Sequence, residues 1–153
     1  MTPPERRDLA MTTAELQDIL DTSFSDGPSP YEVTAVEPSG VTIRIDPSNH
    51  QIRPGGTVSG PTMMGLADCA AWLATLAVIG PVLLAVTSSL DIHFLTKPQP
   101  GAELRATGSL LRLGRRQSVS AVEIVSQAAG SEAILVAHAT VVYAIPPPAA
   151  SER

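Results

Sequence analysis

A nearly unbroken apolar run over residues 60–79, carrying one charge at Asp68, constrains the fold of this chain more than any other segment. Pro61 suits the first helical position, where its missing N–H costs nothing, and Gly80-Pro81 ends the run. We therefore expect a helix over 60–79. Because this helix is apolar on all sides, it should be buried on all sides. In a domain this small, a sheet must wrap around it, and a second subunit can cover the rest.

A run of about 20 apolar residues also raises the question of a membrane span. A charge at Asp68 would be costly in lipid, and the run is rich in alanine and glycine, which partition weakly into a bilayer. We expect no membrane association. The N-terminal stretch MTPPERRDLAMTT has no apolar segment of the kind found in signal peptides, so we expect a cytoplasmic protein.

The remaining segments predict one helix and six strands around this core. Thr12 or Thr13, followed by Glu15, marks the start of a short helix over 12–22. Strands are expected at 31–37, 41–46, 83–95, 102–113, 117–127 and 133–145, and residues 47–59 form a loop. Strands segregated from one central helix indicate an antiparallel α+β fold. We expect a disordered segment at 1–11, a single domain over 12–146, and a loose tail at 147–153.

Composition excludes several classes of function. The net charge of −5 and the isoelectric point near 5.0 argue against a general nucleic-acid binder, which would carry a basic face. The single cysteine, Cys69, cannot form an internal disulfide. Four Cys or His ligands at zinc-binding spacing are absent, so we expect no metal site.

Asp68 is the residue with the clearest functional signal. A carboxylate is rarely buried in an apolar helix unless it is paired or chemically active. In such a place it can serve as a nucleophile or a general base. The alternative is a structural carboxylate that caps a loop or pairs with Arg53, and the sequence leaves both readings open.

The start of the long helix is the second candidate feature. Ser59-Gly60-Pro61 places a small residue where unpaired backbone N–H groups emerge. These amides and the helix dipole can bind an oxyanion or polarise a carbonyl group. Ser59 can equally be a simple N-cap, and the two roles are compatible.

Together these features resemble the hotdog-fold thioesterases of the phenylacetate-pathway (PaaI-like) type. The resemblance rests on RPGGTVSGPTMMGLADCAAW at 53–72 and on VTSSLDIHFL at 86–95, and it covers about residues 31–146. Leu66-Ala67-Asp68 matches the family's helix motif directly. Ser59-Gly60-Pro61 stands where the family has His-Gly-Gly, and Pro61 has no N–H to donate.

The resemblance implies a hotdog fold and hydrolysis of an acyl-CoA to a free acid and CoA. No metal or cofactor is implied, because CoA is part of the substrate. Asp68 would be the nucleophile or the base that activates water, the Gly60 amide would hold the thioester carbonyl, and Thr87 would help to place the water. The family also implies a homodimer or a homotetramer with shared active sites, in which Asp68 and Thr87 come from opposite subunits.

The resemblance and the pattern of charges also suggest residues that contact the substrate. The stretch 97–116 carries five basic residues against one acidic residue, and Arg115 and Arg116 suit the phosphates of CoA, although a solvated hairpin would look the same. The substrate-binding candidates are Asn49, His50, Arg53, Ser59, Pro61, Gly65, Trp72, Ser88, Arg115 and Arg116. The alternative function is a non-catalytic hotdog module that binds a thioester. A hydratase of the same fold is a remote third option, because it would want an Asp–His pair near the helix start.

Overall fold

The computed structural model describes residues 7–24 and 27–148. Two helices, a short 3-10 turn and six strands follow one another along the chain. Their bounds are α1 (Thr13–Ser23), β1 (Tyr31–Glu37), β2 (Gly40–Ile45), η1 (Pro47–Asn49), α2 (Gly60–Ile79), β3 (Val86–Phe94), β4 (Glu103–Leu113), β5 (Gln117–Gln127) and β6 (Ile134–Ala144). The predicted long helix is confirmed at both ends. The main difference is that β3 begins three residues later than predicted.

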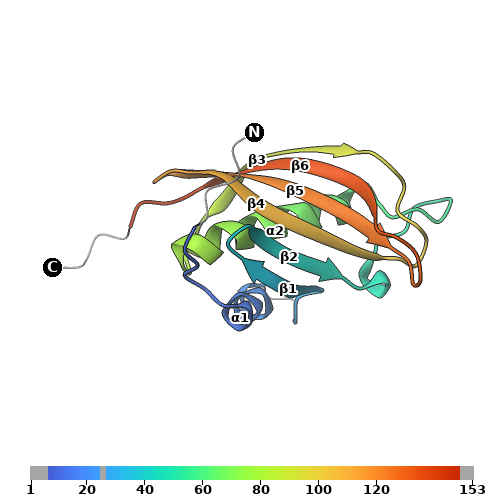
Figure 1. Cartoon of the computed structure of the whole chain (residues 1–153), viewed down its shortest axis with the longest axis horizontal. Helices are drawn as coiled ribbons and strands as arrows, with labels where there is room; N and C mark the ends of the chain where they lie inside the picture. Colours follow the sequence, from blue (N-terminus) through green and yellow to red (C-terminus); the bar gives the residue numbers. More distant parts are fainter. Residues whose placement is uncertain (1–6, 25–26, 149–153) are drawn as a thin grey trace.

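The six strands form one antiparallel sheet in the order β1-β2-β4-β5-β6-β3. The sheet curves around α2, as Figure 1 shows, and α1 lies beside the β1 edge. This is the hotdog fold, and the predicted α+β class is confirmed. The strands β1 and β3 are the two edges of the sheet.

Alternation along the inner strands directs one set of side chains at α2. In β2, for example, Val41, Ile43 and Ile45 are buried, whereas the residues between them are partly exposed. Gly108 in β4 lets the sheet lie directly against the backbone of α2. A Cβ atom on Gly108 would lie 2.7 Å from the backbone oxygen of Ala70, so only hydrogen fits at this position.

The C-terminal half of α2 is largely enclosed, since every residue from 69 to 77 is buried and only the last two residues of the helix are partly exposed. Thr75 donates a hydrogen bond to the backbone oxygen of Ala71 at 3.0 Å, and its hydroxyl lies 2.8 Å from that of Ser118 in β5. The backbone N–H of Ala10 donates to the oxygen of Ala77 at 2.7 Å. By length and composition α2 could cross a membrane, but 67% of its most apolar window is buried, so it is the core helix of this fold.

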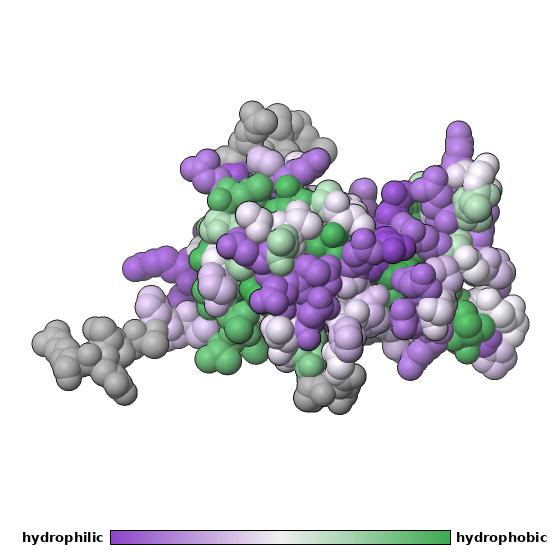
Figure 2. Space-filling view, turned by 90° about the horizontal axis from the view of Figure 1, so that it is seen from below, coloured by the Kyte–Doolittle hydropathy of each residue, from purple (hydrophilic) through white to green (hydrophobic). Residues whose placement is uncertain are grey.

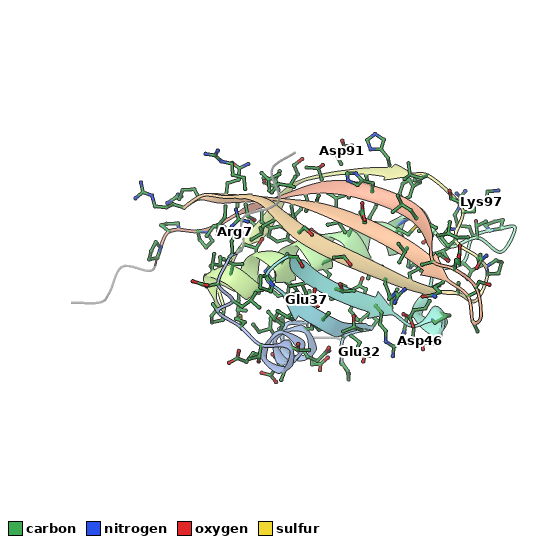
Figure 3. The ribbon with its side chains drawn as sticks, viewed as in Figure 1. Arg7, Glu32, Glu37, Asp46, Asp91 and Lys97 are labelled. Atoms are coloured by element: carbon green, nitrogen blue, oxygen red, sulfur yellow. The ribbon has the colours of Figure 1, made fainter. Side chains whose placement is uncertain are left out.

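The two edges of the sheet are covered unequally. The helix α1, started by a capping box between Thr12 and Glu15, packs buried leucine and isoleucine residues toward the fold and turns its polar side outward. Hydrophilic residues accordingly cross the middle of the face seen in Figure 2. By contrast, β3 is exposed along most of its length: Val86 is 60% exposed and Phe94 is 49% exposed. Figure 3 shows Asp91 projecting outward from this strand.

Candidate active site

Asp68 lies on the only side of α2 that the rest of the described chain leaves open. Pro61, Met64, Gly65 and Asp68 follow one another at helical spacing, and all four are exposed or partly exposed. Their neighbours on the other sides of the helix are buried against the sheet. Within one chain the helix is therefore not covered on every side. From the sequence, a second subunit can cover the remaining part, and the one charged residue of the helix lies in this uncovered stripe.

Two hydroxyl groups hold one oxygen of the Asp68 carboxylate. The Thr87 hydroxyl donates to Oδ1 at 2.6 Å, and the Tyr143 hydroxyl donates to the same atom at 2.8 Å. The Tyr143 hydroxyl also lies 3.2 Å from the backbone oxygen of Asp68. Within the described ranges no hydrogen bond reaches Oδ2. One oxygen is thus fixed, while the other is available to a ligand or a water molecule.

Tyr143 is a member of this cluster that the sequence did not indicate. Burial raises the pKa of Tyr143 far above its ordinary value, and the nearby charge of Asp68 acts in the same direction. Tyr143 therefore remains a proton donor to Asp68. No local pattern could have revealed this contact, because Tyr143 occupies one inward position of an alternating strand, 75 residues from Asp68.

The structure corrects one expectation about Thr87. The resemblance implied that Asp68 and Thr87 come from opposite subunits, but the two side chains are hydrogen-bonded within one chain. The reason is topological. Because β3 pairs antiparallel with β6 of the same chain, Thr87 lies opposite Tyr143, and both hydroxyl groups reach Asp68 on α2.

A cavity of about 930 Å³ opens in front of Asp68. It lies between the open stripe of α2, the end of α1 with the segment leading into β1, and residues 83–87. Four of the five aromatic residues in the chain line it, namely Phe24, Tyr31, Trp72 and Tyr143. A volume of this size, with mainly apolar walls and a few polar groups, is typical of a small-molecule site.

Trp72 and Phe24 form part of the cavity wall. Their rings meet edge to face, with centroids 6.3 Å apart and an interplanar angle of 69°. The indole N–H of Trp72 is buried and has no hydrogen-bond partner in the described residues. Cys69 also lines the cavity, but burial, assisted by the charge of Asp68, raises the pKa of its thiol, so it is a poor nucleophile.

The start of α2 offers only one free amide among its first three residues. Ser59 is the N-cap, and its hydroxyl accepts a hydrogen bond from the N–H of Thr62 at 3.3 Å. Pro61 has no N–H. This leaves Gly60, whose missing side chain makes room for Phe94: a Cβ atom there would lie 3.3 Å from the Phe94 ring. Gly60 lies eight residues before Asp68, about 12 Å along the helix axis.

The predicted substrate contacts divide into two groups. Gly65, Trp72 and Thr87 line the Asp68 cavity. The other candidates lie outside its lining, namely Asn49, His50, Arg53, Ser59, Gly60, Pro61, Ser88, Arg115 and Arg116. Asn49 and Arg53 are exposed in the loop before α2, and the bond predicted as an alternative between Arg53 and Asp68 is absent from the described part of the chain.

His50 and the arginine pair occupy separate places. Burial lowers the pKa of His50, whose Nε2 atom has no hydrogen-bond partner among the described residues. Arg115 and Arg116 are exposed in the turn between β4 and β5. Arg115 borders a second apolar cavity, of about 1210 Å³, which shares Leu83 and Leu84 with the first.

The described residues, 7–24 and 27–148, offer no recognisable metal site. These residues include no cluster of three or more His, Cys, Asp or Glu side chains that could hold a metal ion. The chemistry that the site itself offers is that of an oriented carboxylate, two hydroxyl donors and an apolar cavity.

Comparisons with known proteins agree with this geometry. The family model described as the thioesterase superfamily matches residues 55–133. A crystal structure of a candidate thioesterase from Silicibacter sp. TM1040 is 33% identical, covers 94% of this chain and 97% of its own, and superimposes with a TM-score of 0.81. A search of curated proteins found no match.

Two further solved structures share the fold. The phenylacetic acid degradation protein PaaI from Thermus thermophilus is 28% identical, with a TM-score of 0.63 over 74% of this chain and 91% of its own. A thioesterase from Haemophilus influenzae is only 15% identical, yet it has a TM-score of 0.77 over 97% of this chain and 100% of its own, a likeness of fold alone. With a family match over half of its length and a relative at 33% identity over almost all of it, the chain belongs to the thioesterase superfamily.

Proposed function

We propose that this protein hydrolyses an acyl-CoA thioester and that Asp68 is its catalytic carboxylate. Membership of the thioesterase superfamily supports thioester hydrolysis as the type of reaction. The observation that carries the assignment to Asp68 is the arrangement of its carboxylate beside the cavity. Thr87 and Tyr143 hold Oδ1, and Oδ2 has no donor among the described residues.

The two donors on Oδ1 fix the direction in which Asp68 acts. Holding a carboxylate in one orientation lowers the entropic cost of reaching the reacting geometry. Oδ2 can then attack the thioester carbon, or it can accept a proton from a water molecule that attacks this carbon. In both routes the C–S bond breaks, the acid is released after addition of water, and the CoA thiolate takes up a proton.

The thioester carbonyl needs hydrogen-bond donors, and Gly60 of the same chain is too far away to serve Asp68. A carbonyl group bound at Asp68 would need a donor within about 3 Å, whereas Gly60 lies about 12 Å along α2. We therefore infer that Gly60 of a second copy completes the site. The expected homodimer, alone or as half of a tetramer, becomes a requirement of the chemistry.

The exposed edge strand β3 offers a way to bring the second Gly60 close. Near the start of β3, Thr87 contacts Asp68, and at its end Phe94 lies over Gly60. If β3 pairs antiparallel with its own copy, the start of one strand meets the end of the other. A pairing centred on Leu90 sets Val86 opposite Phe94 of the second copy and keeps the two Asp91 side chains from facing each other.

The cavity and the charged turn suggest which part of the substrate each region would bind. The acyl group fits the aromatic-lined space in front of Asp68, as in a thioesterase of the PaaI-like type. Arg115 and Arg116 remain our proposed contacts for the CoA phosphates, since Arg115 borders the adjoining cavity.

Release of free CoA from a panel of acyl-CoAs tests the proposal directly. We expect turnover by the wild type, and Asp68→Asn should lower kcat by about 10²–10⁴-fold, the usual contribution of a general base. Asparagine keeps an oxygen that can accept from Thr87 and Tyr143, so thermal stability should change little.

Asp18→Asn is the matched control, because it removes a carboxylate from the exposed side of α1, outside the cavity. This variant should retain full activity. Binding of acyl-CoA without turnover by the wild type would favour the non-catalytic module instead, and turnover that persists in Asp68→Asn would remove Asp68 from the mechanism.

A further inference from the structure

One hydroxyl group in the cavity has no partner and no role in the mechanism above. Tyr31 is the first residue of β1, and its side chain reaches across to α2, where a Cβ atom on Gly65 would lie 2.9 Å from the Tyr31 hydroxyl oxygen. No described residue forms a hydrogen bond with this hydroxyl. It lines the same cavity as Asp68, Thr87 and Tyr143.

The position of Tyr31 is fixed by its backbone. Its N–H donates to the hydroxyl of Ser29 at 3.1 Å, and its carbonyl oxygen accepts from the side-chain amide of Gln17 in α1 at 3.2 Å. Burial, with smaller effects from Cys69 and Asp68, raises the pKa of Tyr31 to about 12. The hydroxyl is therefore protonated at neutral pH and can donate a hydrogen bond.

The start of α2 is short of donors for an oxyanion. Stabilisation of the charge that develops on a carbonyl oxygen normally uses more than one preorganised donor. Pro61 has no N–H, and the N–H of Thr62 is already directed at Ser59. A thioester oxygen bound near this helix start would receive a single amide hydrogen bond, from Gly60.

We propose that the Tyr31 hydroxyl supplies the second hydrogen bond to the thioester oxygen. This inference rests on the proposed function. The proposed site then combines Tyr31 and Asp68 of one chain with Gly60 of the second copy.

The spacing along α2 is consistent with this role. Gly65, which the Tyr31 hydroxyl touches, precedes Asp68 by three residues on the same side of the helix, and such pairs have Cβ positions about 5–6 Å apart. A thioester carbon beside Oδ2 could then direct its oxygen at Tyr31. Tyr31 transfers no proton in this step, because it only stabilises the negative oxygen while the bond to the nucleophile forms and until the C–S bond breaks.

The same contact explains why residue 65 is a glycine. A methyl group at this position would lie 2.9 Å from the Tyr31 oxygen and would force the hydroxyl away from the helix. Gly65→Ala should therefore impair the same donor as Tyr31→Phe, although alanine favours the helix. Removing the hydroxyl would also remove the clash.

The test compares Tyr31→Phe, Gly65→Ala and the double variant in full-length protein, with kcat and KM measured on the best acyl-CoA of the panel. We expect Tyr31→Phe to lower kcat by about 10²-fold, as loss of an oxyanion donor does, with KM within about twofold of the wild type. Gly65→Ala should lower kcat in the same way, and the double variant should be no worse than Tyr31→Phe alone.

Each outcome separates this inference from the proposed function. If Asp68-dependent turnover is present but Tyr31→Phe keeps its kcat, or changes KM alone, Tyr31 is not an oxyanion donor and Asp68 is unaffected. Additive losses in the double variant would likewise overturn the shared role of Gly65 and Tyr31. If the wild type shows no Asp68-dependent turnover, both proposals fall. Thermal unfolding of each variant identifies a loss of activity caused by misfolding, and retention of the wild-type midpoint is expected for Tyr31→Phe.

Discussion

The two halves of α2 are both largely apolar, but they have very different surroundings. From residue 69 to 77 every residue of the helix is buried, β4 comes close enough to require Gly108, and the segment around Ala10 closes the end. Only Cys69 and Trp72 of this half reach the wall of the Asp68 cavity. From residue 60 to 68 one stripe remains open, and this stripe carries Asp68. The closed half holds the fold together, whereas the open half leaves space for a ligand and for a second copy.

The largest loss of stability is expected for Gly108→Ala, which adds a methyl group against the closed half of the helix. The added methyl group would meet the backbone of Ala70, which cannot rotate away as a side chain could. We expect the free energy of unfolding to fall by about 1–3 kcal/mol, the usual cost of overpacking a core. Urea unfolding followed by circular dichroism measures this loss.

Gly65→Ala is the informative comparison for that experiment. Its methyl group meets only the end of the Tyr31 side chain in the open half, so its effect on unfolding should be much smaller. Equal losses of stability in the two variants would contradict the division of the helix into a closed half and an open half.

A smaller effect is expected at β3, where we place the second copy. In a pairing centred on Leu90, Ser89→Asp would set a carboxylate opposite Asp91 of the other chain, twice per dimer. At roughly 0.2–1 kcal/mol for each pair, this repulsion should raise the dissociation constant of the dimer. At a fixed protein concentration, activity should then decline because fewer chains are paired. Ser89→Lys would set opposite charges together and should not weaken the dimer.

Sedimentation equilibrium at low salt distinguishes these two variants, with Ser89→Ala as the neutral reference. A compact single chain that keeps full Asp68-dependent activity would contradict the shared site. A dimer that responds equally to both charges would place the interface elsewhere.

The smallest effect should appear at alkaline pH. The folded protein holds the pKa of Tyr31 at about 12, above the ordinary value of 10.0, so between these values it binds more protons than the unfolded chain. Stability from this group is complete below pH 10 and is lost as the pH rises toward 12. Since the side chain is partly exposed, the loss at pH 11 should be below about 1 kcal/mol. Burial also raises the pKa values of Tyr143 and Cys69, so the stability of the wild type declines through these groups as well. Chemical unfolding at pH 9 and pH 11 therefore measures the Tyr31 contribution as the difference between the wild type and Tyr31→Phe, and the decline should be shallower in the variant.

Local signals in the sequence were enough to predict α2 and most strands. Ser59 and Pro61 define where the helix starts, and Gly80 with Pro81 defines where it stops, so its bounds agree with the structure. The start of β3 was predicted too early, because Leu83 and Leu84 extend the apolar pattern of the strand. In the structure both side chains are exposed in a turn that separates two cavities.

The partners of Asp68 illustrate what a sequence pattern leaves out. Thr87 followed from the family resemblance, but its position in the same chain as Asp68 depends on which strand neighbours β3, and a pattern of alternating residues does not specify strand order. Tyr143 and Tyr31 come from opposite ends of the chain and meet α2 only after the sheet has curved. Their contacts depend on long-range packing, which periodicity does not encode.

The burial of the single thiol next to Asp68 has a practical consequence. Cys69 is 7% exposed, and its thiol rarely ionises, so alkylating reagents and mild oxidants should leave the native protein untouched. Labelling would then report on molecules in which the surroundings of Cys69 have opened. The chain thus contains a natural single-site probe of opening events next to Asp68.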